Sequence, residues 1–141
     1  MGFDIHGMNP VIRKGKKNVG AYFRNNVWWW RGLWDYVYEV CDDVISEDEW
    51  NEGHSNSGLT IDEDRAKKIA KRLNQLIKDG YTQVYIDTWE SRRKFAEEHN
   101  KGLKKGAGDK NYEWIADYPL DIDNIQRFAD FCADSGGFQI C

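Results

Sequence analysis

The spacing of apolar residues along the chain predicts four helices. They cover about residues 33–45, the stretch from a capping box at Thr60–Glu63 to Gly80, about residues 82–100, and about residues 122–135. In each stretch apolar side chains recur at the period of one helix face. In the capping box a hydroxyl and a carboxylate three residues apart satisfy free amides of the first turn. Asp121 caps the last helix, and glycine supplies a left-handed stop at Gly80 and at residues 136–137.

Shorter alternating segments near the two ends predict a small sheet. Phe3 and Ile5 alternate with polar neighbours, and so do Phe138 and Ile140, which is the period of a half-buried strand. The simplest arrangement is an antiparallel sheet formed near the termini and covered by helices. We therefore predict an α+β fold that is rich in helix. Further candidate strands are residues 19–24 and 112–117.

The composition fits a single domain, residues 1–141, with an aromatic core. The length matches the usual domain size of about 100–150 residues, and seven Trp with seven Tyr compensate for a low aliphatic content. A loop over residues 101–111, rich in lysine and glycine, is predicted to be flexible. The formal net charge of −4 excludes a generally basic, phosphate-neutralising protein. Non-specific binding to nucleic acid is therefore not expected.

No segment predicts export or membrane insertion. No apolar run approaches the ~18–20 residues of a membrane span, and the first residues lack a cationic segment followed by an apolar one. The three cysteines are far apart and form no C-x-x-C, which is typical of buried thiols in a reducing compartment. We expect a cytoplasmic protein with no membrane partner and no metal site.

The standard catalytic signatures are absent. Residues 102–108 are rich in glycine but lack the Gly-Lys-[Ser/Thr] end of a P-loop, and residues 53–58 are a near miss for G-x-S-x-G. The sequence pattern identifies no set of nucleophile, base and orienting group. We therefore predict no catalytic residues and no cofactor. A small hydrolase that uses Asp4, His6 or His54 for acid–base chemistry stays as a further alternative.

The run Tyr22–Tyr36 carries the candidate ligand site. Its three adjacent tryptophans cannot all face one core, because neither a helix nor a strand places successive side chains together. Aromatic planes, guanidinium groups and amides together suit a planar, anionic ligand such as a nucleotide. Stacking contributes about 1–3 kcal/mol per base, and a charge-assisted hydrogen bond from arginine about 1.5–3 kcal/mol. The alternative is that the tryptophans fill the core while the arginines extend over it.

Each residue of this site has an expected role. Phosphate would be held by Arg24 and Arg31, polar edges would be read by Asn25 and Asn26, and the stacking face would consist of Trp28, Trp29, Trp30 and Trp34. A second stretch, residues 53–58, adds His54 and Asn56 in a glycine-bounded loop before a helix N-terminus, where an anion is stabilised. Acidic residues in that first turn favour a plain solvent-exposed loop instead.

Charge is segregated along the chain, and this supports a hypothesis of a different class. Residues 5–34 contain no acid, whereas residues 42–64 contain nine acids and no Lys or Arg. Exposed Trp and Tyr are typical hot spots of protein interfaces, and an acidic surface steers a basic partner. The chain is therefore also a candidate inhibitor of another protein, and a homo-oligomer is possible.

A group of small bacteriophage-encoded proteins of unassigned function resembles this chain at its two ends. The shared segments are residues 1–7 (MGFDIHG), residues 22–36 (YFRNNVWWWRGLWDY), Tyr118-Pro119, residues 128–131 (FADF) and residues 136–141 (GGFQIC). The resemblance implies a phage gene product made in the host bacterial cytoplasm, and it carries no catalytic residues. Small phage accessory proteins often counter host defence, either by sequestering a signalling nucleotide or by blocking a defence protein.

Overall fold

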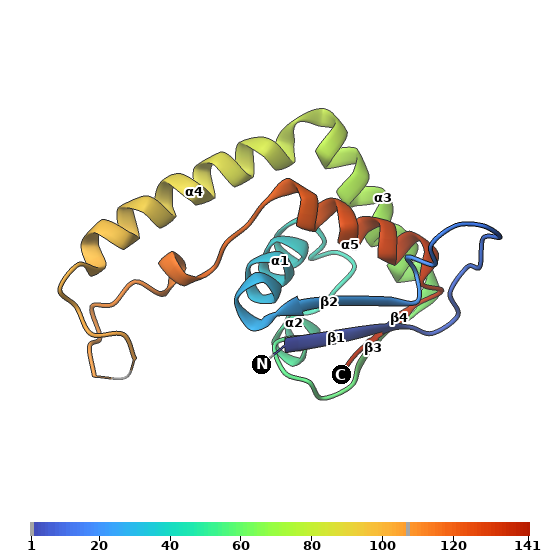
Figure 1. The fold of residues 1–141 in the computed structure, drawn as a ribbon, viewed down its shortest axis with the longest axis horizontal. Helices are drawn as coiled ribbons and strands as arrows, with labels where there is room; N and C mark the ends of the chain where they lie inside the picture. The colour runs from blue at the N-terminus through green and yellow to red at the C-terminus, as the bar shows by residue number, and fades with distance from the viewer. Residues whose placement is uncertain (1, 107) are drawn as a thin grey trace.

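The computed structural model describes residues 2–106 and 108–141, so residue 107 of the predicted loop lies outside it. In chain order the elements are β1 (Gly2–Gly7), β2 (Tyr22–Asn26), α1 (Val27–Val40), α2 (Glu47–Glu52), β3 (Leu59–Ile61), α3 (Glu63–Asp79), α4 (Tyr81–Asn100), the 3-10 helix η1 (Trp114–Asp117), α5 (Ile122–Asp134) and β4 (Phe138–Ile140). The predicted α+β class, rich in helix, is confirmed (Figure 1).

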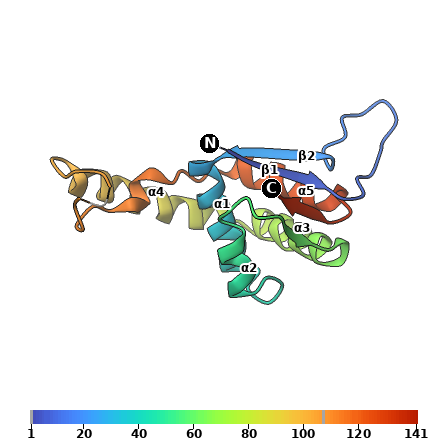
Figure 2. The same ribbon diagram turned by 90° about the horizontal axis from the view of Figure 1, so that it is seen from below.

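The four strands form one antiparallel sheet in the order β2-β1-β4-β3. The strands from the two ends of the chain are neighbours, as predicted, with Ile5 opposite Ile140. β4 is an inner strand, because β3 pairs with its other edge. Buried and less buried positions alternate along the strands, as expected when helices cover one face only. Figure 2 shows the helices gathered on that face.

The core lies between the sheet and the helices α1, α3 and α5. Phe128 of α5 is its centre, because its ring packs edge-on against Phe23 of β2, Trp30 of α1 and Phe138 of β4 at centroid distances of 5.2, 5.7 and 5.7 Å. All four side chains are buried. Aromatic packing therefore replaces the aliphatic residues that the composition lacks.

Helix α4 projects from this body, and the chain returns along it (Figure 1). We call α4 the arm and residues 108–119 the return segment. Several hydrogen bonds hold them together. Among them, Trp89 donates its indole N–H to the Tyr118 carbonyl (2.7 Å), and Asn100 exchanges two hydrogen bonds with the Glu113 backbone (2.9 and 2.8 Å). The return segment therefore depends on α4 for its position.

Several predicted boundaries are wrong. The first helix spans Val27–Val40 and does not begin near residue 33. It begins early because the Asn26 side chain accepts a hydrogen bond from the backbone N–H of Trp29 and so caps the helix. Thr60 does not cap the next helix: it lies in β3, and Asp62 is the cap of α3. The strand expected at residues 19–24 is shifted to Tyr22–Asn26, and residues 112–117 contain η1 instead of a strand.

The predicted ends of the other helices are confirmed. α3 stops at Gly80, whose φ of 86° is left-handed, and α4 continues directly to Asn100. Asp121 caps α5 by accepting the amide of Asn124, and Gly136 and Gly137 follow it with φ of 68° and 94°. The glycines allow the sharp reversal from α5 into β4.

Candidate functional site

The helical start at Asn26 distributes the tryptophan run around α1. Trp30 points into the core, whereas Trp28 and Trp29 are half-buried at the surface. Trp30 stacks on Trp34 at 5.3 Å, and both rings are fully buried. The indole N–H of Trp30 donates to the Gly53 carbonyl (2.8 Å), and that of Trp34 donates to the Trp50 carbonyl (2.9 Å). The expectation that Trp30 and Trp34 belong to a stacking face is therefore wrong: they fill the core.

A first hollow of about 310 Å³ lies where the end of β2 and the start of α1 meet the start of α5. Asn25 and Asn124 contribute a reciprocal amide pair to its lining, with N···O distances of 2.9 and 2.8 Å. They are only 7% and 5% exposed. Both amides are thus bonded within the protein, so the predicted role of Asn25 in reading a ligand edge has no support from its contacts. The lining consists of Arg24, Asn25, Asn26, Trp29, Asp121, Asp123, Asn124 and Arg127.

The first hollow carries charges of both signs. Arg24 forms an exposed ion pair with Asp4 (3.2 Å). Arg127 donates to Asn124 Oδ1 (2.8 Å) and lies over the Phe23 ring at 5.4 Å, and it has no carboxylate partner among the residues described. Asp121 and Asp123 supply carboxylates at the start of α5. The hollow therefore suits a ligand that offers both an anionic group and N–H donors.

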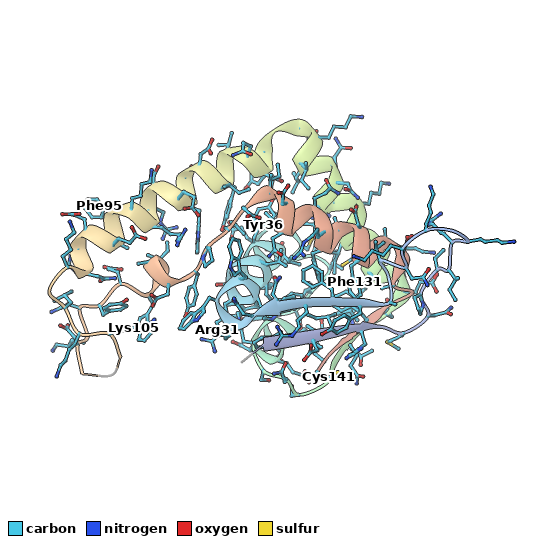
Figure 3. All side chains as sticks on the ribbon, viewed as in Figure 1. Arg31, Tyr36, Phe95, Lys105, Phe131 and Cys141 are labelled. Atoms are coloured by element: carbon cyan, nitrogen blue, oxygen red, sulfur yellow. The ribbon has the colours of Figure 1, made fainter. Side chains whose placement is uncertain are left out.

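A second hollow of about 300 Å³ lies between α1 and the return segment. Its lining shares Asn26 and Trp29 with the first hollow and adds Trp28, Arg93, Lys105, Asp117 and Pro119. Lys105 Nζ stands 4.3 Å from the centre of the Trp28 ring and 3.4 Å from Asp117 Oδ1. Figure 3 shows Lys105 on the side where the returning chain passes α1. A ligand that stacked on Trp28 would have to displace this ammonium group.

Two residues that line the second hollow each have a buried polar atom without a hydrogen-bond partner in the part of the chain that the structure covers. These atoms are Nε of Arg93 and Oδ2 of Asp117. The rest of each side chain is bonded, since Arg93 pairs with Glu90 at 2.7 Å and Asp117 with Lys105. Buried polar groups are normally satisfied. Because both atoms are enclosed by the protein, a ligand in the hollow could bond to them only if the side chains moved.

The remaining predicted residues lie elsewhere. Arg31 is half-buried with Nε unpaired, and it lines neither hollow, so its expected contact with phosphate has no support. His54 bonds through Nε2 to Asp35 Oδ1 (3.0 Å) and meets the Trp50 ring edge-on at 5.1 Å. Asn56 donates to the Gly2 carbonyl at 3.3 Å. His54 and Asn56 therefore attach the loop at residues 53–58 to the body and do not join the tryptophan site.

Sequence reasoning missed the partners that complete the two hollows. Asp121 was recognisable as a helix cap, but Arg93, Asp117 and Arg127 carry no motif and lie more than 60 positions from Trp29. Within residues 2–106 and 108–141 no three His, Cys, Asp or Glu side chains gather as ligands for a metal ion. Over the same residues no helix is long and apolar enough to cross a bilayer.

Comparison with protein-family models finds no family that matches the chain. Comparisons with curated proteins and with solved structures find no significant match either. The two hollows around Trp29 and the chemistry of their linings therefore supply the structural basis for a functional proposal.

Proposed function

We propose that the protein binds a small, planar, anionic ligand of the nucleotide class at the two hollows beside Trp29, without turning it over. One observation carries the proposal. A half-buried indole borders both hollows, and each hollow supplies two cations, Arg24 and Arg127 in the first and Arg93 and Lys105 in the second. Stacking with neighbouring guanidinium groups is the combination that holds a base and its phosphate.

The charges of the first hollow match the two ends of a nucleotide. A phosphate would lie against Arg24 and Arg127, and a base bearing an amino group would donate to Asp121 or Asp123. Arg24 and Asp4 are 53% and 41% exposed in their side chains. An exposed ion pair of this kind is worth at most about 1 kcal/mol, so exchanging it for a phosphate costs little.

A counter-defence role would extend this proposal, and it rests on the expected resemblance of the chain's two ends to small phage proteins. A protein that holds a signalling nucleotide removes it from host defence in proportion to the protein's abundance, and it needs no catalytic group. We therefore include a counter-defence role by sequestration in the proposal. The host bacterial cytoplasm is the compartment in which such a protein would act.

The alternative, inhibition of a host protein through exposed aromatic residues, stays a prediction. Of the seven tryptophans only Trp114 is clearly exposed, at 42%. The others are buried or half-buried. A hot-spot surface made of tryptophan therefore has little area to offer, and the acidic residues 42–64 are its main remaining support.

A nucleotide panel tests the proposal. Nucleoside monophosphates, cyclic mononucleotides and cyclic dinucleotides are titrated while tryptophan fluorescence and the melting temperature are recorded. A bound nucleotide stabilises the fold by RT ln(1 + [L]/Kd), about 2.7 kcal/mol at a hundredfold excess over Kd. The variants Trp29→Leu and Arg127→Gln should weaken binding at least tenfold. No shift with any member at millimolar concentration would reject the proposal.

Matched controls separate the site from general effects. Arg92 lies outside both hollows, on α4, and Trp114 lies on η1. Arg92→Gln and Trp114→Leu should therefore leave nucleotide affinity unchanged. If these controls weaken binding as much as Trp29→Leu and Arg127→Gln do, the nucleotide binds elsewhere and the assignment of the site is wrong.

A further inference from the structure

One face of α4 carries an exposed stripe of apolar and small polar side chains. Val84 and Phe95 are 65% and 80% exposed, and Figure 3 shows Phe95 far out on the arm. The opposite face of the helix, with Ile86, Trp89 and Ala96, is buried or half-buried. Tyr81, Val84, Thr88, Ser91 and Phe95 follow one another at spacings of three and four residues. This is the seven-residue repeat by which one helix pairs with another.

The two polar members of the stripe are suited to burial. Thr88 donates its hydroxyl hydrogen to the Val84 carbonyl, and Ser91 donates to the Asp87 carbonyl, both at 3.0 Å. Because each hydroxyl already has a partner within the helix, covering this face breaks no hydrogen bond. Their small side chains also let a second helix approach closely.

We propose that this face binds the same face of a second copy of the chain, with the two α4 helices antiparallel about a two-fold axis. In that register Val84 packs on Phe95 of the second copy, and Thr88 packs on Ser91 of the second copy. Both pairs repeat by symmetry, since in a two-fold interface residue i meets j and j meets i. Because α4 projects from the body (Figure 1), an antiparallel pair would place the two bodies at opposite ends.

Charge complementarity selects this register. Asp87 and Lys94 flank the stripe on the same side, seven residues apart. In the antiparallel pair Asp87 of each copy lies beside Lys94 of the other, which gives two ion pairs across the interface. Lys94 has no ion-pair partner within its own chain among the residues described here, whereas neighbouring Arg93 is paired with Glu90. Lys94 is therefore available to the second copy.

The arm also has a hollow that could receive a side chain of the second copy. A hollow of about 400 Å³ beside Phe95 lies between α4 and the return segment, with Arg92, His99 and Ile115 in its lining. In the proposed register Val84 of the second copy lies at this hollow. The stripe spans about 21 Å at 1.5 Å per residue. A single helix pair is a small interface, so we expect a dissociation constant on the order of micromolar.

Sedimentation equilibrium of the full chain between about 1 and 500 µM tests the pairing. We expect a monomer–dimer equilibrium that Val84→Ser and Phe95→Ser each weaken at least tenfold. Ile12→Ser is the matched control, because Ile12 is equally exposed at 77% but lies on the loop between β1 and β2. A monomer at every concentration would overturn the proposal, and so would a dimer that the α4 variants leave unchanged.

A charge exchange tests the register and orientation. Asp87→Lys alone should weaken the dimer, because it faces Lys94 of the second copy, and Asp87→Lys with Lys94→Asp should restore it. Failure of the double variant to recover would reject the antiparallel register. If the wild-type chain stays monomeric while Phe95→Ser abolishes binding of a different protein, the face serves another partner and our proposal is wrong. The nucleotide site uses other side chains, so the two proposals can fail separately.

Discussion

Truncation of Phe138 should cost the fold a large part of its stability. It lies on the inner strand β4, is fully buried, and packs against Phe128 and Phe131 at centroid distances of 5.7 and 5.8 Å. Replacing a buried phenylalanine by alanine typically costs about 3–5 kcal/mol, because burial is lost and a cavity remains. The total stability of a domain is about 5–15 kcal/mol. Phe138→Ala should therefore remove between a fifth and all of the free energy of unfolding.

Urea denaturation followed by tryptophan fluorescence measures this loss. The matched control is Gln139→Ala on the same strand, since Gln139 is exposed and bonds only to the Gly58 carbonyl at 3.4 Å. Its effect should stay within about 0.5 kcal/mol. The midpoint should fall for Phe138→Ala while the slope with urea stays unchanged. A loss below 1 kcal/mol would refute the placement of β4 between β1 and β3 over the aromatic core.

Two further predictions concern α1 and its surroundings. Alanine normally stabilises a helix interior by about 1 kcal/mol relative to glycine, but a Cβ at Gly32 would lie 2.5 Å from the Pro119 carbonyl oxygen. Gly32→Ala should therefore lower the midpoint of urea unfolding. A rise in the midpoint would show that the return segment does not pack this closely against α1. Burial raises the pKa of both Tyr36 and Cys41 to about 12, from ordinary values of 10.0 and 9.0. The folded state keeps both protons at pH values where the unfolded chain releases them, so stability should be complete below pH 9 and decline between pH 9 and about 12. A free energy of unfolding that stays flat from pH 8 to 11 would contradict the burial of both groups.

The sequence predicts those parts of the fold in which the local pattern and tertiary packing agree. The apolar stripe that ends at Gly80 and the one that follows Asp121 each face the core, and the alternating ends of the chain pair in one sheet. The pattern fails for short elements. β3 and α2 have three and six residues, and they exist because neighbours supply a partner strand or a connecting loop. Helix α4 is a third case, since it carries apolar residues on two faces and the sequence cannot say which one meets the body.

The candidate site, like the fold, was predicted only in part from the sequence. Consecutive tryptophans must point in different directions, and the structure places one inside and two at the surface, as that argument requires. Which one lies inside depends on where the helix begins, and the capping role of Asn26 was not recognised. Of the charges around Trp29, only Arg24 is near in sequence, and the others come from α5, α4, the loop that holds Lys105 and the return segment. No spacing rule connects these distant residues to the tryptophan run, so only the β2–α1 part of the two linings could be predicted from the sequence.

The two hollows differ in how firmly the fold holds them. The first is built from β2, α1 and α5, which belong to the body, and its buried Asn25–Asn124 pair fixes one strand to one helix. The second is completed by Arg93 of the arm and by the return segment, whose main links run to α4. A ligand spanning Trp29 would therefore tie the arm to the body. Pairing of two α4 helices leaves that tie in place, because Arg93 and Phe95 project from opposite sides of the helix.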